Sequence, residues 1–196
     1  FPSLMVRAAY QATLGRMPNQ VEETSWVAEI RAGKSLELIT KTNAERFRVS
    51  KVEREATILR AYLRAYGKTP SRSQVNDISS AILASDSKIK SFNDLVAKFI
   101  IELKNNENNR KEVIKKSYLD ALGYEPSASE ISAWNMNTWS NTYENLALSH
   151  WQWLKNDVKR RQDLAKRVYK KLFNREPSAT EATDIDTGIV KNGFLF

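Results

Sequence analysis

The chain has 196 residues, 41% of them hydrophobic, and a formal net charge of +8. It has no cysteine, which excludes disulfides and thiolate metal sites but does not decide the compartment. The sequence contains no recognisable signal peptide, no alternating strand pattern and no apolar run near the roughly 18 residues of a membrane span. We therefore predict an all-α protein with enough apolar residues for one large or two small cores.

A short motif, Tyr-x-x-x-apolar-Gly/Asn-x-x-Pro, occurs four times, at residues 10–18, 62–70, 118–126 and 169–177. The tyrosines lie 52, 56 and 51 residues apart. Self-similarity at such a period is typical of a tandem array. We predict about four helical repeats, at approximately 1–50, 51–105, 106–157 and 158–196, the last one incomplete. We expect the chain to be a piece of a longer protein, and its final repeat to expose apolar surface.

Each motif predicts the end of one helix, a tight turn and the start of a second helix. Tyr and the apolar residue four positions later share a helical face. The next residue, Gly15, Gly67, Gly123 or Asn174, takes the left-handed conformation that ends a helix, and proline follows because it cannot continue one. A capping box then begins the second helix, with the pairs Asn19/Glu22, Ser71/Gln74, Ser127/Glu130 and Ser178/Glu181.

The repeat extends beyond the turn into a third helix. Pairs on one face of the second helix are Trp26/Ile30, Ile78/Ile82, Trp134/Thr138 and Ile185/Ile189, with Thr138 the polar exception. We predict third helices at 35–42, 92–103 and 143–154, and expect the last two to run on into the next Tyr helix. Each repeat is then about three helices.

The sequence offers little for catalysis. Its single histidine, His150, follows Ser149, and adjacent helix residues point in different directions, which argues against a dyad. We expect His150 to be a partly buried helix residue. No Gly-rich phosphate loop and no metal-binding motif occurs, and nothing indicates a paired-carboxylate hydrolase, although carboxylates are plentiful. We predict no catalytic residue, no metal and no cofactor.

Positive charge is the strongest signal beyond packing. Nine basic residues and two acidic ones lie between Trp151 and Arg175. Lys155, Lys159, Lys166 and Lys170 are spaced as one helical stripe, and Arg160 and Arg167 lie beside it, while Leu154, Val158, Leu164, Val168 and Leu172 are expected to form the buried face. A second basic group, diluted by glutamates, is Arg46, Arg48, Lys51, Arg54 and Arg60. Such a stripe is either a solvated face or the site of an anionic partner.

Aromatic residues cluster around the third repeat. Trp139 and Tyr143 flank a polar turn and match no core position in the other repeats. If they are exposed, their rings could stack on a sugar while nearby amides and hydroxyls bind its hydroxyl groups. Burial in the core is the alternative for both residues.

The residues also suggest a family. The run from Val6 to Pro18, followed by Trp26, Ile30 and the segment 33–36 (Gly-Lys-Ser-Leu), resembles a bacterial domain of unknown function that recurs in S-layer and secreted RTX-type surface proteins. The chain has Glu22, Gln74, Glu130 and Glu181 where that family usually has glycine. Residues 7–10 and 129–131 are also similar to the phycobilisome linker domain, an all-helical basic scaffold. Neither resemblance implies a catalytic residue.

The favoured expectation is a non-enzymatic, extracellular scaffold of the bacterial surface that binds cell-surface polysaccharide such as lipopolysaccharide. Self-assembly into a lattice and further domains of a longer chain would accompany it. The ligand-binding candidates are Lys155, Lys159, Arg160, Lys166, Arg167, Lys170, Trp139 and Tyr143. The alternatives are a cytoplasmic assembly linker that binds an acidic protein, then non-specific nucleic-acid binding, then an enzyme.

Overall fold

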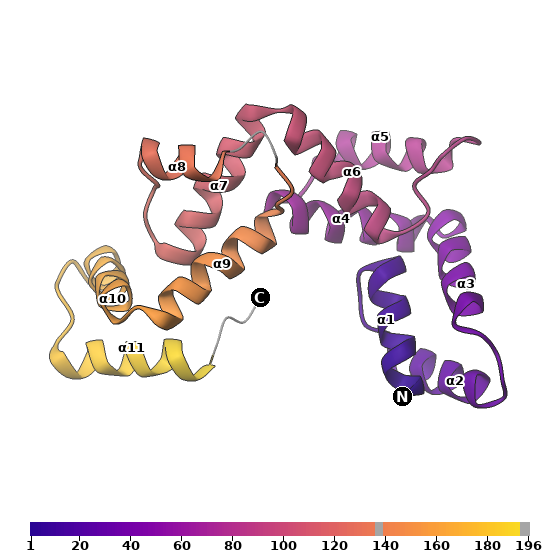
Figure 1. Cartoon of the computed structure of the whole chain (residues 1–196), viewed down its shortest axis with the longest axis horizontal. Coiled ribbons are helices and arrows are strands. Elements are labelled where there is room, and N and C mark those ends of the chain that lie inside the picture. The colour runs from indigo at the N-terminus through magenta and orange to yellow at the C-terminus, as the bar shows by residue number, and fades with distance from the viewer. Residues whose placement is uncertain (136–138, 193–196) are drawn as a thin grey trace. The chain divides into compact units, whose positions relative to one another are not determined.

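A computed structural model describes residues 1–135 and 139–192. Within these ranges the chain forms eleven α-helices and no strand, which confirms the all-α prediction (Figure 1). Thr138, predicted as the polar exception of the repeat, lies outside the described residues. None of the described helices combines the length and the apolar character needed to cross a membrane.

The chain divides into two compact units, Phe1–Glu102 and Leu103–Phe196, and the boundary falls within α6. The helices of the first unit are α1 (Pro2–Leu14), α2 (Gln20–Arg31), α3 (Leu36–Val49), α4 (Lys51–Tyr66), α5 (Arg72–Leu83) and most of α6 (Phe92–Asn105). Those of the second are α7 (Glu107–Leu122), α8 (Ala128–Trp134), α9 (Tyr143–Asn156), α10 (Val158–Phe173) and α11 (Ala179–Asn192).

The helices recur in a fixed order. The four Tyr motifs lie on α1, α4, α7 and α10, which we call the Tyr helices, and α2, α5, α8 and α11 follow each turn as second helices. The third helices are α3, α6 and α9. Each third helix ends one residue before the next Tyr helix, at Ser50, Asn106 or Asp157, whose side chain caps the new helix. The expected run-on of the third helix into the Tyr helix was therefore wrong, because these capping residues have extended backbones.

The turn chemistry follows the sequence prediction closely. Gly15, Gly67 and Gly123 have φ of 66°, 69° and 71°, and Asn174 has φ of 53°. Reciprocal capping-box hydrogen bonds form at all four second helices. Gly15 is also required for space, because a Cβ there would lie 2.2 Å from the ring of Phe92. Each turn thus fixes where one helix ends and the next begins.

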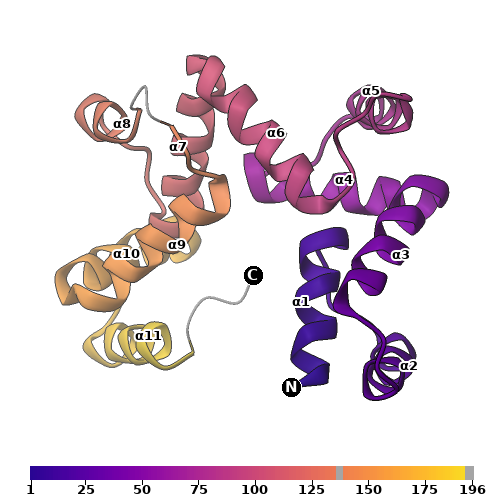
Figure 2. The ribbon, with the colours of Figure 1, turned by 45° about the vertical axis from the view of Figure 1, so that its right-hand side comes forward.

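The third helices supply the cover for the Tyr helices. They bury residues at intervals of four: Ile39, Asn43 and Phe47 in α3; Leu95, Phe99 and Leu103 in α6; Leu146, His150 and Leu154 in α9. Figure 2 shows α3 beside α1, and the ring of Phe99 packs edge-on against Tyr62 and Tyr66 of α4. The motif residues Tyr10, Tyr62 and Tyr118 are buried as a result.

A buried arginine recurs eight residues before the motif tyrosine, as Arg54, Arg110 and Arg161. The Nη1 atom of Arg110 donates to the carbonyls of Leu103 and Lys104, 3.1 and 2.6 Å away, at the end of the preceding third helix. Its Nε donates to Asn135 Oδ1 at 2.7 Å, just after the second helix. Each arginine therefore joins three successive helices, the last of one repeat and the first two of the next, and we call these residues the arginine clamps.

Arg161 repeats the arrangement of Arg110, and Arg54 bonds one helix-end carbonyl instead of two. Arg161 donates to the carbonyls of Leu154 and Lys155 and, through Nε, to Asp186. Arg54 donates to the carbonyl of Arg48 and to Ser79. In all three, the Nε acceptor lies 25 residues after the arginine, at Ser79, Asn135 or Asp186. Sequence reasoning placed Arg54 and Arg161 in basic surface groups, whereas both point inward.

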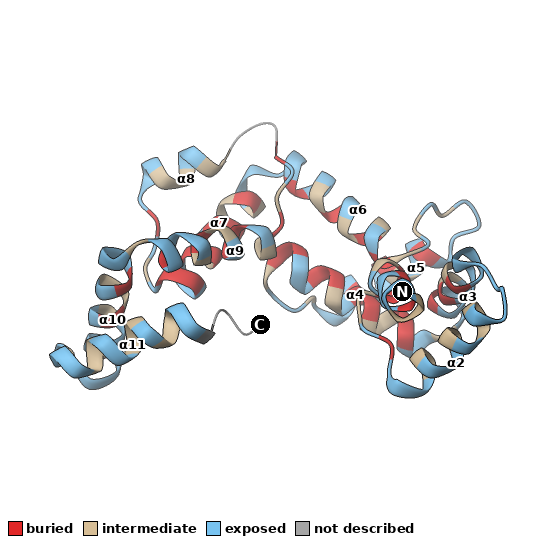
Figure 3. Cartoon of the chain, turned by 60° about the horizontal axis from the view of Figure 1, so that its bottom comes forward, coloured by how far each residue is buried: buried red, intermediate tan, exposed pale blue. Residues whose placement is uncertain are grey.

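The fourth repeat departs from this packing. Leu154 is buried and Leu164 half-buried, but Val158, Val168 and Leu172 are 54%, 36% and 67% exposed, so the prediction of one buried face along this stretch was wrong. Figure 3 shows α11 and most of α10 without the buried positions that line α7 and α9. The physical reason is that no third helix covers α10 within the described residues. Apolar surface is exposed in this repeat, as expected.

Replacing Arg110 with methionine keeps most of the side-chain volume but removes every donor of the clamp. We expect the free energy of unfolding to fall by about 2–4 kcal/mol, because two carbonyls and a side-chain amide lose a charged partner. Urea denaturation measures the change. The same replacement at exposed Arg31 is the control and should stay within about 0.5 kcal/mol of the parent. Equal stabilities of the two variants would contradict the clamp.

Candidate functional site

The polar atoms of the repeated motif are occupied by the fold. Tyr10 and Tyr118 accept hydrogen bonds from the indole Nε1 of Trp26 and Trp134, at 3.2 and 3.1 Å. Burial raises the pKa of both tyrosine hydroxyls. In the second repeat, Tyr62 accepts from Gln74 at 2.9 Å instead. A binding site must therefore be sought where the copies differ.

An ion-pair cluster fills the junction between the first and second repeats. Glu53 of α4 is only 8% exposed. Its carboxylate lies 3.0 Å from Arg16, 2.8 Å from Arg60 and 3.5 Å from Arg46. Arg16 and Arg46 also pair with Glu22. We call these five residues the Glu53 cluster.

The arginines keep both carboxylates of the Glu53 cluster ionised. Hydrogen bonds from Arg16 outweigh burial and lower the pKa of Glu22 to about 2. Burial alone would raise the pKa of Glu53, but hydrogen bonds from Arg16 and Arg60 lower it overall. Every charge here is paired within the protein, so most of the second basic group predicted from sequence is structural.

The predicted lysine stripe is divided by a helix break. Lys155 lies on α9, and Lys159, Lys166 and Lys170 lie on α10, because Asp157 interrupts the helix and caps the new one. All four side chains are exposed. Spacings of seven and four residues place the three α10 lysines on one face, which we call the α10 lysine face. None of these lysines has an ion-pair partner in the part of the chain that the structure describes.

A cavity of about 340 Å³ lies between the third-repeat turn and α10. We call it the junction pocket; it is lined by Leu122, Tyr124, Glu130, Leu154, Asp157, Lys159, Arg160, Asp163 and Arg167. The guanidinium of Arg167 lies 4.7 Å from the ring centre of Tyr124, and its buried Nε has no acceptor among the described residues. Arg160 pairs with Asp157 at 3.2 Å and lies over Trp153. Three predicted binding residues, Lys159, Arg160 and Arg167, therefore meet here.

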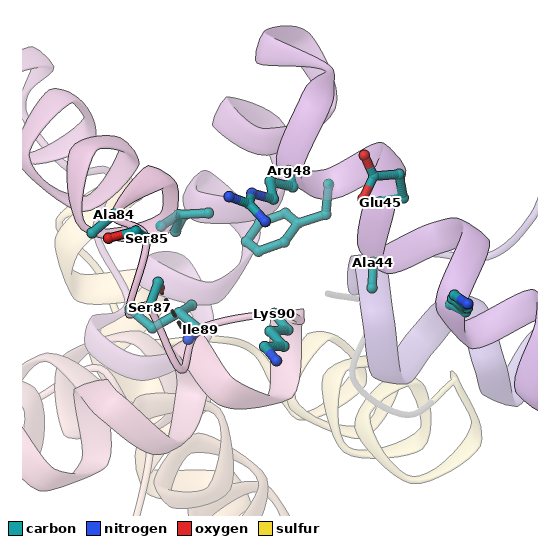
Figure 4. Close-up of a pocket in the computed structure, with 11 residues that line it drawn as sticks. Ala44, Glu45, Arg48, Ala84, Ser85, Ser87, Ile89 and Lys90 are labelled. Carbon is teal, nitrogen blue, oxygen red and sulfur yellow. Dashed lines mark hydrogen bonds between the residues drawn. The ribbon is translucent and has the colours of Figure 1, made fainter.

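A second cavity, of about 290 Å³, lies between α3 and the loop that joins α5 to α6 (Figure 4). Arg48 extends across it toward the loop that carries Ser85 and Ser87. Lys41 and Lys90 also line it, with Glu45 the one acidic lining residue. Sequence reasoning missed this pocket, because the loop and α3 are brought together only by folding. The only lining residue that the sequence singled out was Arg48, as a member of the second basic group.

The aromatic platform predicted from sequence does not form. Trp139 is 4% exposed, so its ring has no free face for a sugar. Tyr143 is half-buried, its hydroxyl donates to Asp120 Oδ2 at 2.7 Å, and Lys116 lies 5.7 Å from its ring centre. Burial, followed by the hydrogen bond to Asp120, raises the pKa of this hydroxyl. Both residues belong to the structure of the third repeat.

His150 is fully buried rather than partly buried. Its Nε2 lies 3.1 Å from Ser117 Oγ, which donates its own proton to the carbonyl of Ile114 at 2.8 Å. With the hydroxyl proton on this carbonyl, the imidazole Nε2 donates to Ser117 and does not serve as its base. Ser149 turns away and donates to the carbonyl of Asn145. Burial, with a smaller effect of Arg160, lowers the pKa of His150 from its ordinary 6.5 to about 4.

No group of three or more His, Asp or Glu side chains suited to a metal ion occurs among the residues described. Comparison with protein-family models, with curated proteins and with solved structures found no match. The candidate sites therefore depend on their own geometry and charge.

The buried imidazole predicts an acid-sensitive fold. The unfolded chain takes up a proton on His150 below about pH 6.5, whereas the folded chain does so only near pH 4. Stability present above pH 6.5 is therefore lost as the pH falls toward 4, by about 2–3 kcal/mol at pH 4.5. Urea denaturation at pH 7 and pH 4.5 measures this loss. His150→Gln keeps a donor for Ser117 but does not titrate, so the variant should lose about 2–3 kcal/mol less stability between pH 7 and pH 4.5 than the parent. An equal loss of stability in the variant and the parent would contradict the role of His150.

Proposed function

We propose that this chain is a non-enzymatic helical-repeat scaffold that binds acidic cell-surface polysaccharide, such as lipopolysaccharide, and attaches a longer protein to the cell envelope. The α10 lysine face is the observation that carries the proposal. Its three ammonium groups are exposed and have no ion-pair partner among the described residues. Elsewhere in the described chain, many arginines are held by carboxylates or carbonyls.

The chemistry of such a surface suits a polymer with repeated negative charges. One exposed lysine gains little from one anion, because water and salt screen the pair to about 1 kcal/mol or less. Several lysines on a rigid face can meet several phosphates or carboxylates of one polysaccharide at once, and the weak contacts then combine. Lys155 on α9 extends the charge beyond the α10 lysine face.

The resemblance of residues 6–36 to repeats of bacterial S-layer and secreted surface proteins supports the same assignment. It favours a position at the cell surface, where the polysaccharide is the nearest polyanion. His150 is buried, and Ser149 and the capping glutamates are hydrogen-bonded within the protein, which supports a non-enzymatic role.

Charge reversal tests the proposal. Lys159→Glu, Lys166→Glu and Lys170→Glu together should weaken binding to purified lipopolysaccharide at least tenfold at about 0.15 M salt, because attraction becomes repulsion. Co-sedimentation with lipopolysaccharide measures the affinity. Lys34→Glu, Lys51→Glu and Lys115→Glu change the net charge equally on other exposed positions and form the matched control.

Equal losses in the two triple variants would overturn the α10 lysine face as the binding site. An unmodified chain that binds lipopolysaccharide no better than neutral dextran would overturn the function. Preference for an acidic protein or for nucleic acid in the same assay would do so as well.

A further inference from the structure

Two of the three junctions between repeats, the first and the third, can be compared position by position, because each is built from the same places in the motif. Arg16 and Glu22 follow their motif tyrosine by six and twelve residues, as Tyr124 and Glu130 do. Arg46, Glu53 and Arg60 precede the next motif tyrosine by sixteen, nine and two residues, as Trp153, Arg160 and Arg167 do. The first set is the Glu53 cluster, and the second surrounds the junction pocket. The chain therefore shows one site in two chemical versions.

In the first version a carboxylate occupies the centre. Glu53 receives hydrogen bonds from Arg16 and Arg60, and Arg60 also donates through Nε to the carbonyl of Leu14 at 2.9 Å. Thr57 donates to the same carbonyl. The junction is filled, and the buried carboxylate is stabilised by charge-assisted hydrogen bonds.

In the second version the central carboxylate is replaced by a cation. Arg160 stands where Glu53 would be, and Tyr124 replaces Arg16. Arg167 keeps the place of Arg60, but its guanidinium lies over Tyr124 and its buried Nε has no acceptor among the described residues. A cavity of about 340 Å³ lies here. A buried donor without a partner is costly, and a bound acceptor would remove that cost.

We propose that the junction pocket binds an external carboxylate, which takes the role that Glu53 plays at the first junction. Given the proposed function, on which this assignment of the ligand rests, the carboxylate belongs to a uronic acid residue of the polysaccharide. The guanidinium groups of Arg167 and Arg160 are its donors, and Lys159 at the rim adds positive charge. A planar carboxylate matches a guanidinium better than a tetrahedral anion of the same charge matches it.

The acidic residues of the junction pocket do not fill this role. Glu130 is held by the amide of Ser127 and by the hydroxyl of Tyr124. Asp157 accepts from the backbone amide of Arg160 as a helix cap and from its Nε at 3.2 Å, so it competes with a bound carboxylate for this guanidinium. Asp163 lines the pocket and opposes an anion, so the predicted affinity is modest and depends on the two arginines.

Sodium glucuronate is the probe, and the ¹H–¹⁵N resonance of Arg167 Nε is the readout. The resonance should shift in a saturable manner with glucuronate and stay unchanged with glucose. Arg160→Glu restores the Glu53 arrangement inside the pocket, so it should raise the apparent Kd for glucuronate at least tenfold without unfolding the chain. Arg160→Gln removes the charge without supplying a carboxylate and should cause a smaller loss. Lys115→Glu, which matches the sign of the charge change at an exposed site, should leave the titration unchanged.

An unchanged Arg167 resonance, or equal glucuronate affinity in Arg160→Glu and the parent, would overturn the pocket. Inorganic phosphate that binds as tightly as glucuronate would overturn the carboxylate assignment.

The junction pocket and the proposed function can be tested independently of each other. Lys166→Glu with Lys170→Glu should weaken lipopolysaccharide binding and spare glucuronate. Glucuronate binding without polysaccharide binding would contradict only the function, and the reverse would contradict only the pocket.

Discussion

The fold depends on a tight junction, in which a single residue separates each third helix from the next Tyr helix. Such a junction leaves helix-end carbonyls without amide partners, and burying them unsatisfied would be costly. The arginine clamps resolve this constraint, because one guanidinium bonds the end of the third helix and reaches a side chain of the second helix as well. A charged donor thus substitutes for solvent at these helix ends.

Because the arginine clamps hold the helix ends, the residues in the exposed part of each junction can differ between repeats. At the first junction the variation gives a closed set of ion pairs around Glu53. At the junction of the third and fourth repeats, Tyr124 and Arg160 give an open pocket beside the α10 lysine face. The same backbone therefore carries a purely structural junction and one whose cations face an open cavity. This division agrees with a scaffold in which most copies stabilise the array and one copy carries the proposed binding surface.

Local sequence chemistry was enough to predict the turns and the caps of the second helices, but not where the third helices end. Left-handed Gly15 and Asn174 and the capping box of Ser127 with Glu130 depend on neighbours within four residues. The side of a helix that is buried was predictable only where a third helix exists to cover it. Val168 and Leu172 have an apolar pattern but lack that cover within the described residues.

The candidate sites were less predictable, because they join residues far apart in sequence. The lysines of α10 were identified correctly as exposed cations, but nothing local showed that Arg161 turns inward toward Asp186. Aligning the copies would have shown an arginine eight residues before three of the four motif tyrosines. The sequence left open whether Trp139 is exposed or buried, because it matches no core position in the other repeats, and the structure shows it buried.

The central claim is that the repeated motif builds the frame and that binding occurs where the fourth repeat departs from it. The most direct test is an NMR titration of the whole chain with an acidic oligosaccharide, with the amide shifts mapped along the sequence. The account predicts that the largest shifts lie in α10 and in the third-repeat turn around Tyr124. Shifts spread equally over the motif turns at Gly15, Gly67 and Gly123 would contradict it.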